Sequence, residues 1–226
     1  MVIIGGKKFD IKGENEMEEK VKIQVLGVFG WAGAIEGMRN PKNSWGREDS
    51  VYSPVLEIGP NDLKLMKSLI KGGSEHRKFL RMIHVQLNMW LPRYIWSEFD
   101  TYHFNVKNSC STMHKLLTTE PITLDQFIYD VDDKNSSFVM EKTVEALNEI
   151  RLKYLQVEDN EEKKILLRQA KQLLPEGFIQ KRTVDTNYEE LLTIYKQRIK
   201  HRLPEWQEIC AEIKKLPYFE ELFLTE

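Results

Sequence analysis

The sequence predicts an α+β protein, because its two kinds of hydrophobic pattern occur one after the other. Short β-prone runs separated by turns fill the first half of the chain, and amphipathic helical patterns fill the second half. Strands and helices do not alternate regularly, which argues against a βαβ series. No linker, low-complexity block or internal repeat divides the 226 residues, so a single domain over residues 1–226 is predicted.

Two strands and two helices are expected in the first half. Residues 22–29 begin with the polar–apolar alternation of a half-buried strand, and residues 82–88 show the same alternation. Between these strands, Asn61 can cap a helix that runs to residue 70. Residues 37–44 are rich in turn formers and are expected to form a loop. A further helix is expected to begin near Pro92.

Four helices are expected in the second half, where apolar residues recur at helical spacing. They cover residues 137–155, 161–174, 187–201 and 205–215. The second of these helices stops at Pro175, and the fourth ends before Pro217.

Charge and cysteine content restrict the kinds of partner and compartment. The chain has 33 Lys and Arg residues against 35 Asp and Glu residues, a net charge of −2, which argues against a nucleic-acid or polybasic membrane surface. No apolar run approaches the ~18 residues of a membrane span, and the first residues show no secretory signal. Two distant cysteines, Cys110 and Cys210, favour a reduced, cytoplasmic setting.

Metal sites and thiol nucleophiles have little support in the sequence, and no Gly-rich phosphate loop is present. Cys110 and His114 could share a helical face, but two ligands do not make a zinc site. The acidic residues 130–133 fit a solvated loop better than a cation site. Neither cysteine lies in a nucleophile motif. No metal is therefore predicted.

Residues 93–114 hold the densest mixture of cations, carboxylates, hydroxyls and aromatic rings, directly after a predicted strand. This mixture is a candidate ligand site. The plainer interpretation is an amphipathic helix followed by a capped turn, with Asn108 or Ser109 as the N-cap of the next helix.

Three other polar residues are candidates. Asn187 and Arg198 are eleven positions apart, about three helical turns, so both lie on nearly the same face of one helix. An Asn near free helix N–H groups and an Arg on that face can bind a polar or anionic ligand. The plainer interpretation is an N-cap and a surface Arg. His76 follows Gly72-Gly73 and is either a ligand contact or a histidine of a surface loop.

Several motifs, taken in order, resemble those of the flavin-dependent thymidylate synthases (ThyX) across most of the chain. Residues 170–175 look like the family's Ala-Arg-x-x-Leu-Pro run. Residues 187–198 look like its Asn-x-Arg-x-Leu helix, which ends in a substrate-binding Arg, and residues 205–209 look like the Ala-Gln-x-Glu-Ile stretch that follows. Upstream, His76 looks like the flavin-contacting histidine, and Pro92 like the proline after a strand.

The family's signature, Arg-His-Arg-x-x-Ser-x-Asn-x-x-Ser-x-Arg, is matched in part. Asn108 and Ser111 match its Asn and its second Ser without a gap. Residues 101–103, Thr-Tyr-His, stand in place of Arg-His-Arg, and Val106 and Met113 replace the first Ser and the final Arg.

Three further departures lie near the implied ligands, and two of them change the charge. Glu98 replaces a Gln that contacts the nucleotide in the family, and Lys171 replaces an Arg. Glu189 replaces the family's Arg two places after Asn187. Several cations are thus missing and two carboxylates appear. A divergent branch of the family, of the phage type, is implied.

The resemblance implies an α+β protomer with an antiparallel sheet and a largely helical C-terminal half, assembled as a homotetramer. It implies FAD as cofactor, with NADPH and methylenetetrahydrofolate as co-substrates. The implied reaction transfers a one-carbon unit to C5 of a deoxyuridine or related pyrimidine monophosphate, without a cysteine nucleophile.

The resemblance also assigns roles to individual residues. The implied flavin contacts are His76, His103 and Asn187. The implied nucleotide contacts are Glu98, Ser109, Ser111, Lys171 and Arg198. Arg198 is also the implied catalytic residue, because a fixed cation can polarise the carbonyls of a pyrimidine ring.

Two hypotheses of other classes stay open. Loss of Arg-His-Arg is compatible with a catalytically silent oligomer of the same fold that binds nucleotides or proteins. A DNA-binding module is disfavoured by the balanced charge. Hydroxymethylation is a further variant of the one-carbon transfer, by analogy alone.

Overall fold

Two compact units make up the computed structural model, which describes residues 2–4, 7–9 and 21–225. Unit 1 contains the described residues up to Met89, Thr101–Lys107 and those from Thr183 onward. Unit 2 contains Trp90–Asp100 and Asn108–Arg182. Three strands contribute residues to both units, so the single domain over residues 1–226 stays a prediction.

A four-stranded antiparallel sheet has the order β3-β4-β6-β5. The strands are β3 (Lys22–Phe29), β4 (His84–Pro92), β5 (Val106–Ser109) and β6 (Ile179–Asn187). A separate antiparallel pair is formed by β1 (Val2–Ile4) and β2 (Lys7–Phe9). The prediction of a strand at residues 22–29 is confirmed, and the second predicted strand begins two residues later than expected and extends to Pro92.

Within unit 1, the side chains of β4 alternate between an apolar face and a polar face of the sheet. Val85, Leu87 and Met89 are buried, whereas the residues between them carry polar side chains. On the polar face, His84 Nδ1 and Gln86 Nε2 lie 3.0 and 2.9 Å from the two carboxylate oxygens of Asp185 on β6. Period-two alternation thus sets the register of β4 against β6.

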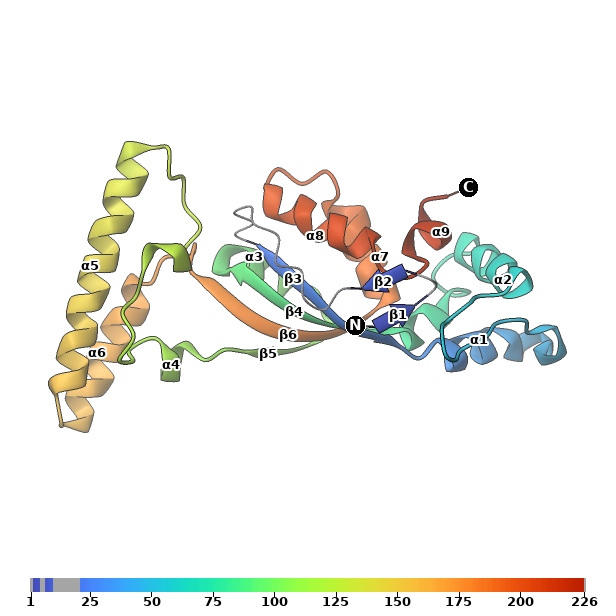
Figure 1. Ribbon diagram of the computed structural model, residues 1–226, viewed down its shortest axis with the longest axis horizontal. Coiled ribbons are helices and arrows are strands. Elements are labelled where there is room, and N and C mark those ends of the chain that lie inside the picture. The colour runs from blue at the N-terminus through green and yellow to red at the C-terminus, as the bar shows by residue number, and fades with distance from the viewer. Residues whose placement is uncertain (1, 5–6, 10–20, 226) are drawn as a thin grey trace. The chain divides into compact units, whose positions relative to one another are not determined.

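The described part of unit 1 also contains α-helices. They are α1 (Trp31–Arg39), α2 (Pro60–Lys71), α7 (Tyr188–Arg198), α8 (Pro204–Lys214) and α9 (Phe219–Phe223). Figure 1 shows α7 and α8 side by side, and they are in contact. The fully buried Tyr188 ring packs edge-on against Trp31, with ring centroids 5.2 Å apart, and tilted against Phe219 at 6.0 Å. These rings join α1, α7 and α9 in one core.

Unit 2 consists mainly of a long helical hairpin. Its helices are α3 (Arg93–Phe99), α4 (Thr112–Lys115), α5 (Lys134–Gln156) and α6 (Asn160–Leu173). Figure 1 shows α5 and α6 packed side by side. Asp133 and Asp159 cap the two helices by accepting hydrogen bonds from backbone N–H groups of their first turns. Phe127 and Leu147 are completely buried in the core of this unit.

Helices predicted in the second half are confirmed to within a few residues at each end. The expected loop at residues 37–44 is wrong in part, because α1 extends to Arg39 and a 3-10 helix follows at Asn40–Lys42. Asn61 is not the cap of α2. That helix begins at Pro60 after Gly59, as a proline in the first turn favours.

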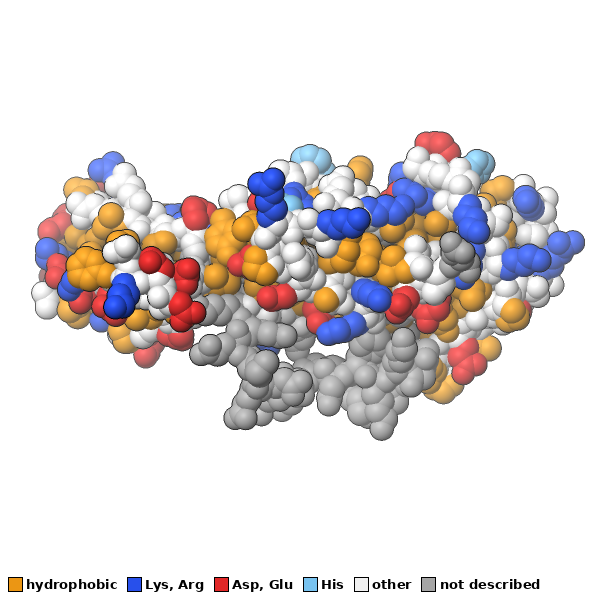
Figure 2. Space-filling model, turned by 90° about the horizontal axis from the view of Figure 1, so that it is seen from above, with side chains coloured by type: hydrophobic (Ala, Val, Ile, Leu, Met, Phe, Trp, Pro, Cys, Tyr) orange, Lys and Arg blue, Asp and Glu red, His pale blue; other side chains and the backbone are white. Residues whose placement is uncertain are grey.

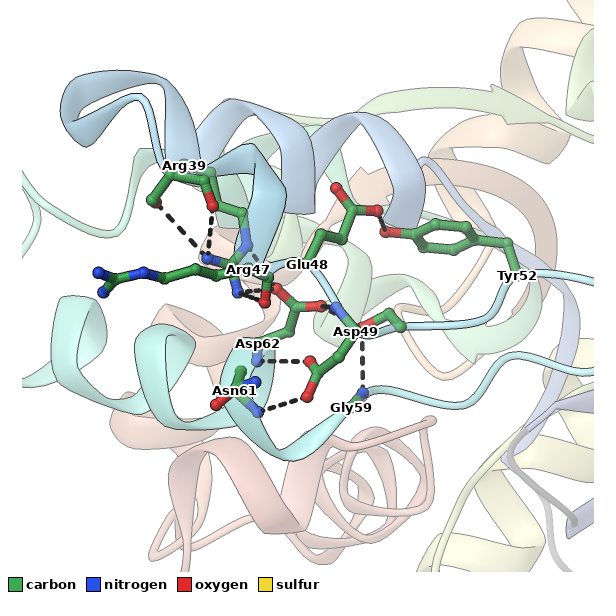
Figure 3. Close-up of polar contacts among 10 residues, drawn as sticks. Arg39, Arg47, Glu48, Asp49, Tyr52, Gly59, Asn61 and Asp62 are labelled. Carbon is green, nitrogen blue, oxygen red and sulfur yellow. Dashed lines mark hydrogen bonds and ion pairs between the residues drawn. The ribbon is translucent and has the colours of Figure 1, made fainter.

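Arg39 and Asp62 form a buried ion pair that joins the end of α1 to the start of α2 (Figure 3). Arg39 Nε donates to Asp62 Oδ1 at 2.7 Å, and Arg39 also donates to the backbone oxygens of Ser44 and Arg47. Asp49 caps α2 by accepting hydrogen bonds from the first-turn N–H groups of Asn61 and Asp62. Hydrogen bonds to charged groups therefore hold the first part of the segment between the helices, at Ser44, Arg47 and Asp49.

Gly30, the residue before α1, has a φ of +88°, and a Cβ built there would lie 2.0 Å from the backbone oxygen of Met82. We expect Gly30→Ala to lower the free energy of unfolding by about 1–3 kcal/mol, because both the left-handed backbone and the close approach oppose a side chain. Chemical denaturation measures this loss. Gly46→Ala is the matched control, since nothing lies within 4 Å of its Cβ position; equal losses in the two variants would contradict the explanation.

Candidate functional site

Of the predicted site residues, His76, His103, Asn187 and Arg198 belong to unit 1. Asn187 is the N-cap of α7, where its Oδ1 accepts a hydrogen bond from the Glu190 backbone N–H at 3.0 Å. Its Nδ2 donates to the Phe104 backbone oxygen at 3.4 Å. The capping role is thus confirmed. The second hydrogen bond connects α7 to the backbone of Phe104, the residue that follows His103.

Glu190 completes this attachment. Its Oε1 accepts hydrogen bonds from the Phe104 backbone N–H at 3.3 Å and from Asn105 Nδ2 at 3.5 Å. Phe104 keeps 74% of its surface exposed, and His103 is exposed as well. The turn at residues 103–104 is therefore anchored through its backbone and presents both side chains to solvent.

Arg198, at the end of α7, is held by two aromatic side chains. Its Nε donates to the Tyr102 hydroxyl at 2.9 Å, and that hydroxyl donates to Gln197 Oε1, also at 2.9 Å. The guanidinium lies over the buried Trp206 ring, 4.6 Å from its centroid, and 5.7 Å from the centroid of Tyr102. Stacking and hydrogen bonding together fix the cation in one orientation.

Both ends of α7 therefore contact the same short segment. Asn187 binds the backbone of Phe104, and Arg198 binds the side chain of Tyr102. Asn187 and Arg198 are thus a whole helix apart and contact neighbouring residues of one segment, and their predicted place on the same face stays a prediction. Sequence analysis missed Tyr102 and Trp206 as supports of Arg198; the aromatic side chain at the centre of Thr101-Tyr102-His103 was the available signal.

Cys210 lies on α8 and is completely buried. Burial raises the pKa of its thiol to about 11, against a smaller opposing effect of the Arg198 charge. A thiol with such a pKa is protonated at neutral pH, and it is neither accessible nor nucleophilic. The lack of a nucleophile motif around Cys210 agrees with this geometry.

His76 is an exposed residue of the turn that follows α2, so its surface-loop position is as expected. The next residue, Arg77, pairs with Glu189 in the first turn of α7. Arg77 Nε lies 2.9 and 3.1 Å from the two carboxylate oxygens, and Nη2 lies 2.9 Å from Oε1. Sequence analysis did not identify Arg77, and this pair gives Glu189 a definite partner.

The other four predicted residues, Glu98, Ser109, Ser111 and Lys171, belong to unit 2. Ser111 is the N-cap of α4, where its Oγ accepts a hydrogen bond from the Met113 backbone N–H at 3.2 Å. Lys171 Nζ lies 3.2 Å from Met113 Sδ, so Lys171 is placed beside the same turn. Ser111 and Lys171 thus both contact Met113, the first at its backbone and the second at its side chain.

Ser109 lies at the end of β5, and its side chain is exposed. Asn108 belongs to the same strand, so the expectation that Asn108 or Ser109 caps the next helix is wrong. The strand continues to Ser109 because it pairs with β6. Only Ser111, two residues later, has the extended backbone and the side-chain acceptor of a cap.

Glu98 lies in the last turn of α3 and is half-buried. Near it in sequence, Asp100 receives two hydrogen bonds from Arg182 Nη1, at 2.9 and 3.0 Å. The Arg182 guanidinium also lies 4.4 Å from the centroid of the Trp96 ring. Arg182 is a fixed cation that sequence analysis missed, since no pattern around it marks a site.

Metal and membrane chemistry find no support in the described ranges. Within residues 2–4, 7–9 and 21–225, no three His, Cys, Asp or Glu side chains are grouped as metal ligands. Asp130 accepts hydrogen bonds from the backbone N–H groups of Asp132 and Asp133, which is a local turn. None of the helices in these ranges combines the length and the apolar character needed to cross a bilayer.

Comparison with known proteins places the fold. No family model and no curated protein sequence matches the chain. Two structures of Thymidylate Synthase X (ThyX) from Helicobacter pylori, each with FAD and dUMP, have TM-scores of 0.67 at 17% and 19% identity. The likeness covers 90% of this chain and 97% and 98% of theirs. The chain has the ThyX fold.

This likeness confirms the predicted fold class, an α+β chain with an antiparallel sheet and a mostly helical C-terminal half. Across the sequence, the motif order that resembles ThyX is now accompanied by the corresponding fold. At 17–19% identity, the likeness concerns the fold alone.

Proposed function

We propose that the chain is a ThyX-like flavoenzyme that transfers a one-carbon unit to C5 of dUMP or a related pyrimidine monophosphate. The observation that carries this proposal is the fold, which is shared over 90% of the chain with ThyX structures that hold FAD and dUMP. The fixed guanidinium of Arg198 adds a chemical reason, because such a cation can stabilise negative charge on a pyrimidine carbonyl.

For the flavin ring we propose contacts from residues of unit 1. His76 and His103 present exposed imidazoles, and Arg77 has N–H groups on Nη1 that no acceptor among the described residues occupies. Asn187 Nδ2 has a second N–H beyond the one given to Phe104. These groups supply neutral and positive donors to ring carbonyls, and FAD when bound supplies the redox chemistry of the reaction.

From the resemblance to ThyX we propose nucleotide contacts in each unit by itself: Arg198 in unit 1, and Glu98, Ser109, Ser111 and Lys171 in unit 2. Because Ser111 Oγ is an acceptor in its capping bond, its O–H remains available to donate to a phosphate oxygen. Lys171 would add a positive charge beside the same turn. Arg198 would polarise the ring, and the protonated, buried Cys210 takes no part as a nucleophile.

NADPH and methylenetetrahydrofolate as co-substrates, a homotetramer, a cytoplasmic location and a divergent phage-type branch belong to the same proposal. The co-substrates and the homotetramer follow from the motif order that resembles ThyX. The divergent branch follows from the departures from that pattern, and the cytoplasmic location from the two distant cysteines. Figure 2 shows both Lys and Arg and Asp and Glu side chains on the face in view. The net charge of −2 favours a small ligand over a nucleic acid.

A catalytically silent protein of the same fold is the second candidate. One observation favours it: Tyr102 occupies the centre of the missing Arg-His-Arg motif and is 8% exposed, committed to Gln197 and Arg198. A buried Tyr cannot replace two arginines as ligand contacts. This candidate predicts a stable oligomer that holds no flavin.

A one-carbon transfer assay separates the two candidates. The protein is incubated with FAD, NADPH, methylenetetrahydrofolate and dUMP, and the nucleotide is analysed by mass spectrometry. We expect a product that carries one additional carbon, and UMP and dCMP serve as comparison substrates. Unchanged nucleotides in all three reactions would favour the silent candidate.

A further inference from the structure

Arg77 and Glu189, which are close in sequence to His76 and Asn187, form a two-pronged ion pair. Two of the three guanidinium nitrogens are engaged, with Nε and Nη2 at 2.9–3.1 Å from the carboxylate oxygens. The side chains are 18% and 14% exposed. Such a two-pronged pair defines the plane of the guanidinium, because both partners are planar.

This pair connects two segments that carry predicted flavin contacts. Arg77 directly follows His76, and Glu189 lies two residues after Asn187. The Arg77 backbone N–H also donates to the Gly73 oxygen at 3.1 Å, so both its backbone and its side chain are fixed. His76 and the first turn of α7 are thereby tied together within unit 1.

The third nitrogen of the guanidinium is unused. Within the described residues 2–4, 7–9 and 21–225, Nη1 of Arg77 has no hydrogen-bond acceptor. The positive charge is already balanced by Glu189. A neutral pair with two remaining N–H donors suits a ring carbonyl oxygen better than a phosphate, whose charge calls for an unbalanced cation.

We propose that Arg77 is a flavin-binding residue: its Nη1, oriented by Glu189, donates to a carbonyl oxygen of the flavin ring. This assignment rests on the proposed function, since it names a donor to the same flavin. Glu189 is then a positioning residue, and the carboxylate at this point of α7 serves to hold a cation that comes from a different segment of the chain.

Flavin titration tests the assignment with two probes, FAD and riboflavin, which share the ring but differ in the phosphates. Binding is followed by quenching of flavin fluorescence in the unmodified protein and in Arg77→Lys, Arg77→Gln and Glu189→Gln. Lys78→Gln is the matched control, because it removes a cation from the next residue, whose side chain is 65% exposed. Thermal unfolding without flavin checks that each variant is folded.

We expect each of Arg77→Lys and Arg77→Gln to weaken the binding of FAD and of riboflavin equally. The expected loss of affinity is about tenfold to a hundredfold, the size expected for loss of a charge-assisted hydrogen bond. Glu189→Gln should weaken both by a smaller factor and shift the visible band of the bound flavin. Lys78→Gln should change neither. If Arg77→Gln fails to fold, the flavin affinity of Arg77→Lys alone tests the assignment.

Three outcomes would overturn the assignment. Unchanged flavin affinity in Arg77→Lys would exclude the hydrogen bond from Arg77 to the flavin. A loss of affinity for FAD but not for riboflavin would mean that Arg77 contacts the phosphates of FAD and not the ring. Unchanged affinity and band position in Glu189→Gln would remove the positioning role. Failure of the proposed function is recognised separately, because the unmodified protein would then bind neither flavin.

Discussion

Replacement of Asp62 by Asn is expected to lower the free energy of unfolding by about 3–5 kcal/mol, since it leaves a buried charge without its partner. Arg39 and Asp62 are 2% and 0% exposed. Besides Arg39, Asp62 accepts hydrogen bonds from the Ser50 hydroxyl at 2.7 Å and from the Asp49 backbone N–H at 3.0 Å. The substitution removes the charge that Arg39 needs and puts an amide N–H₂ where acceptors are required (Figure 3).

Denaturant unfolding measures this loss, with Glu48→Gln as the control in the same segment. Glu48 accepts one exposed hydrogen bond, from the Tyr52 hydroxyl at 2.6 Å, so its replacement should cost less than about 1 kcal/mol. A loss in Asp62→Asn no larger than that of the control would mean that the ion pair does not stabilise the junction of α1 and α2.

The same carboxyl group gives the prediction a pH dependence. Burial raises the pKa of Asp62, but hydrogen bonds from Ser50, the Asp49 backbone and Arg39, with the Arg39 charge, outweigh this effect and hold the pKa below its ordinary value. A lowered carboxyl pKa contributes stability above the pKa of the unfolded state, about 4, and the contribution is lost as the pH falls through the folded pKa. The difference between the unmodified protein and Asp62→Asn should therefore shrink below about pH 4.

Arg198→Lys is the substitution with the largest expected effect on activity, a fall in kcat/KM of about a hundredfold to a thousandfold for the proposed transfer. Lys keeps the charge but cannot both donate to the Tyr102 hydroxyl and lie flat over Trp206. Because the cation is expected to act on the ring as charge develops, kcat should fall more than nucleotide affinity.

Steady-state kinetics with dUMP measures this change, and Arg202→Lys is the control. Arg202 is exposed, so the same replacement there should leave kcat/KM within about twofold. Equal, small effects of the two substitutions would remove Arg198 from the catalytic group, although its packing against Trp206 would stand.

Sequence periodicity was sufficient for the long helices and for β3, because their apolar residues recur at the period of the element. It failed for β6, whose nine residues include only two apolar ones, Ile179 and Val184. That strand is held between β4 and β5, which lie far from it in sequence. It failed for α1 because Gly33 and Gly37 suggest a turn, whereas here they let the Met82 side chain approach the helix.

Predicting the site was limited by distance along the chain. The cap at Asn187 is local and could be found from its helix. The partners of Glu189 and Arg198, by contrast, are 112 and 96 residues away, and no spacing rule relates them. From the sequence, position 189 holds a Glu where the ThyX family has an Arg. Only the structure shows that Arg77 pairs with the carboxylate of this Glu.

The most direct test of the central claim, a ThyX-like flavin and nucleotide site, is a visible absorption spectrum of the purified protein before and after addition of FAD and then dUMP. The account predicts oxidised-flavin bands that remain with the protein after gel filtration and shift when dUMP is added. A colourless protein after filtration, with no spectral response to either ligand, would contradict it and leave the ThyX fold without its chemistry.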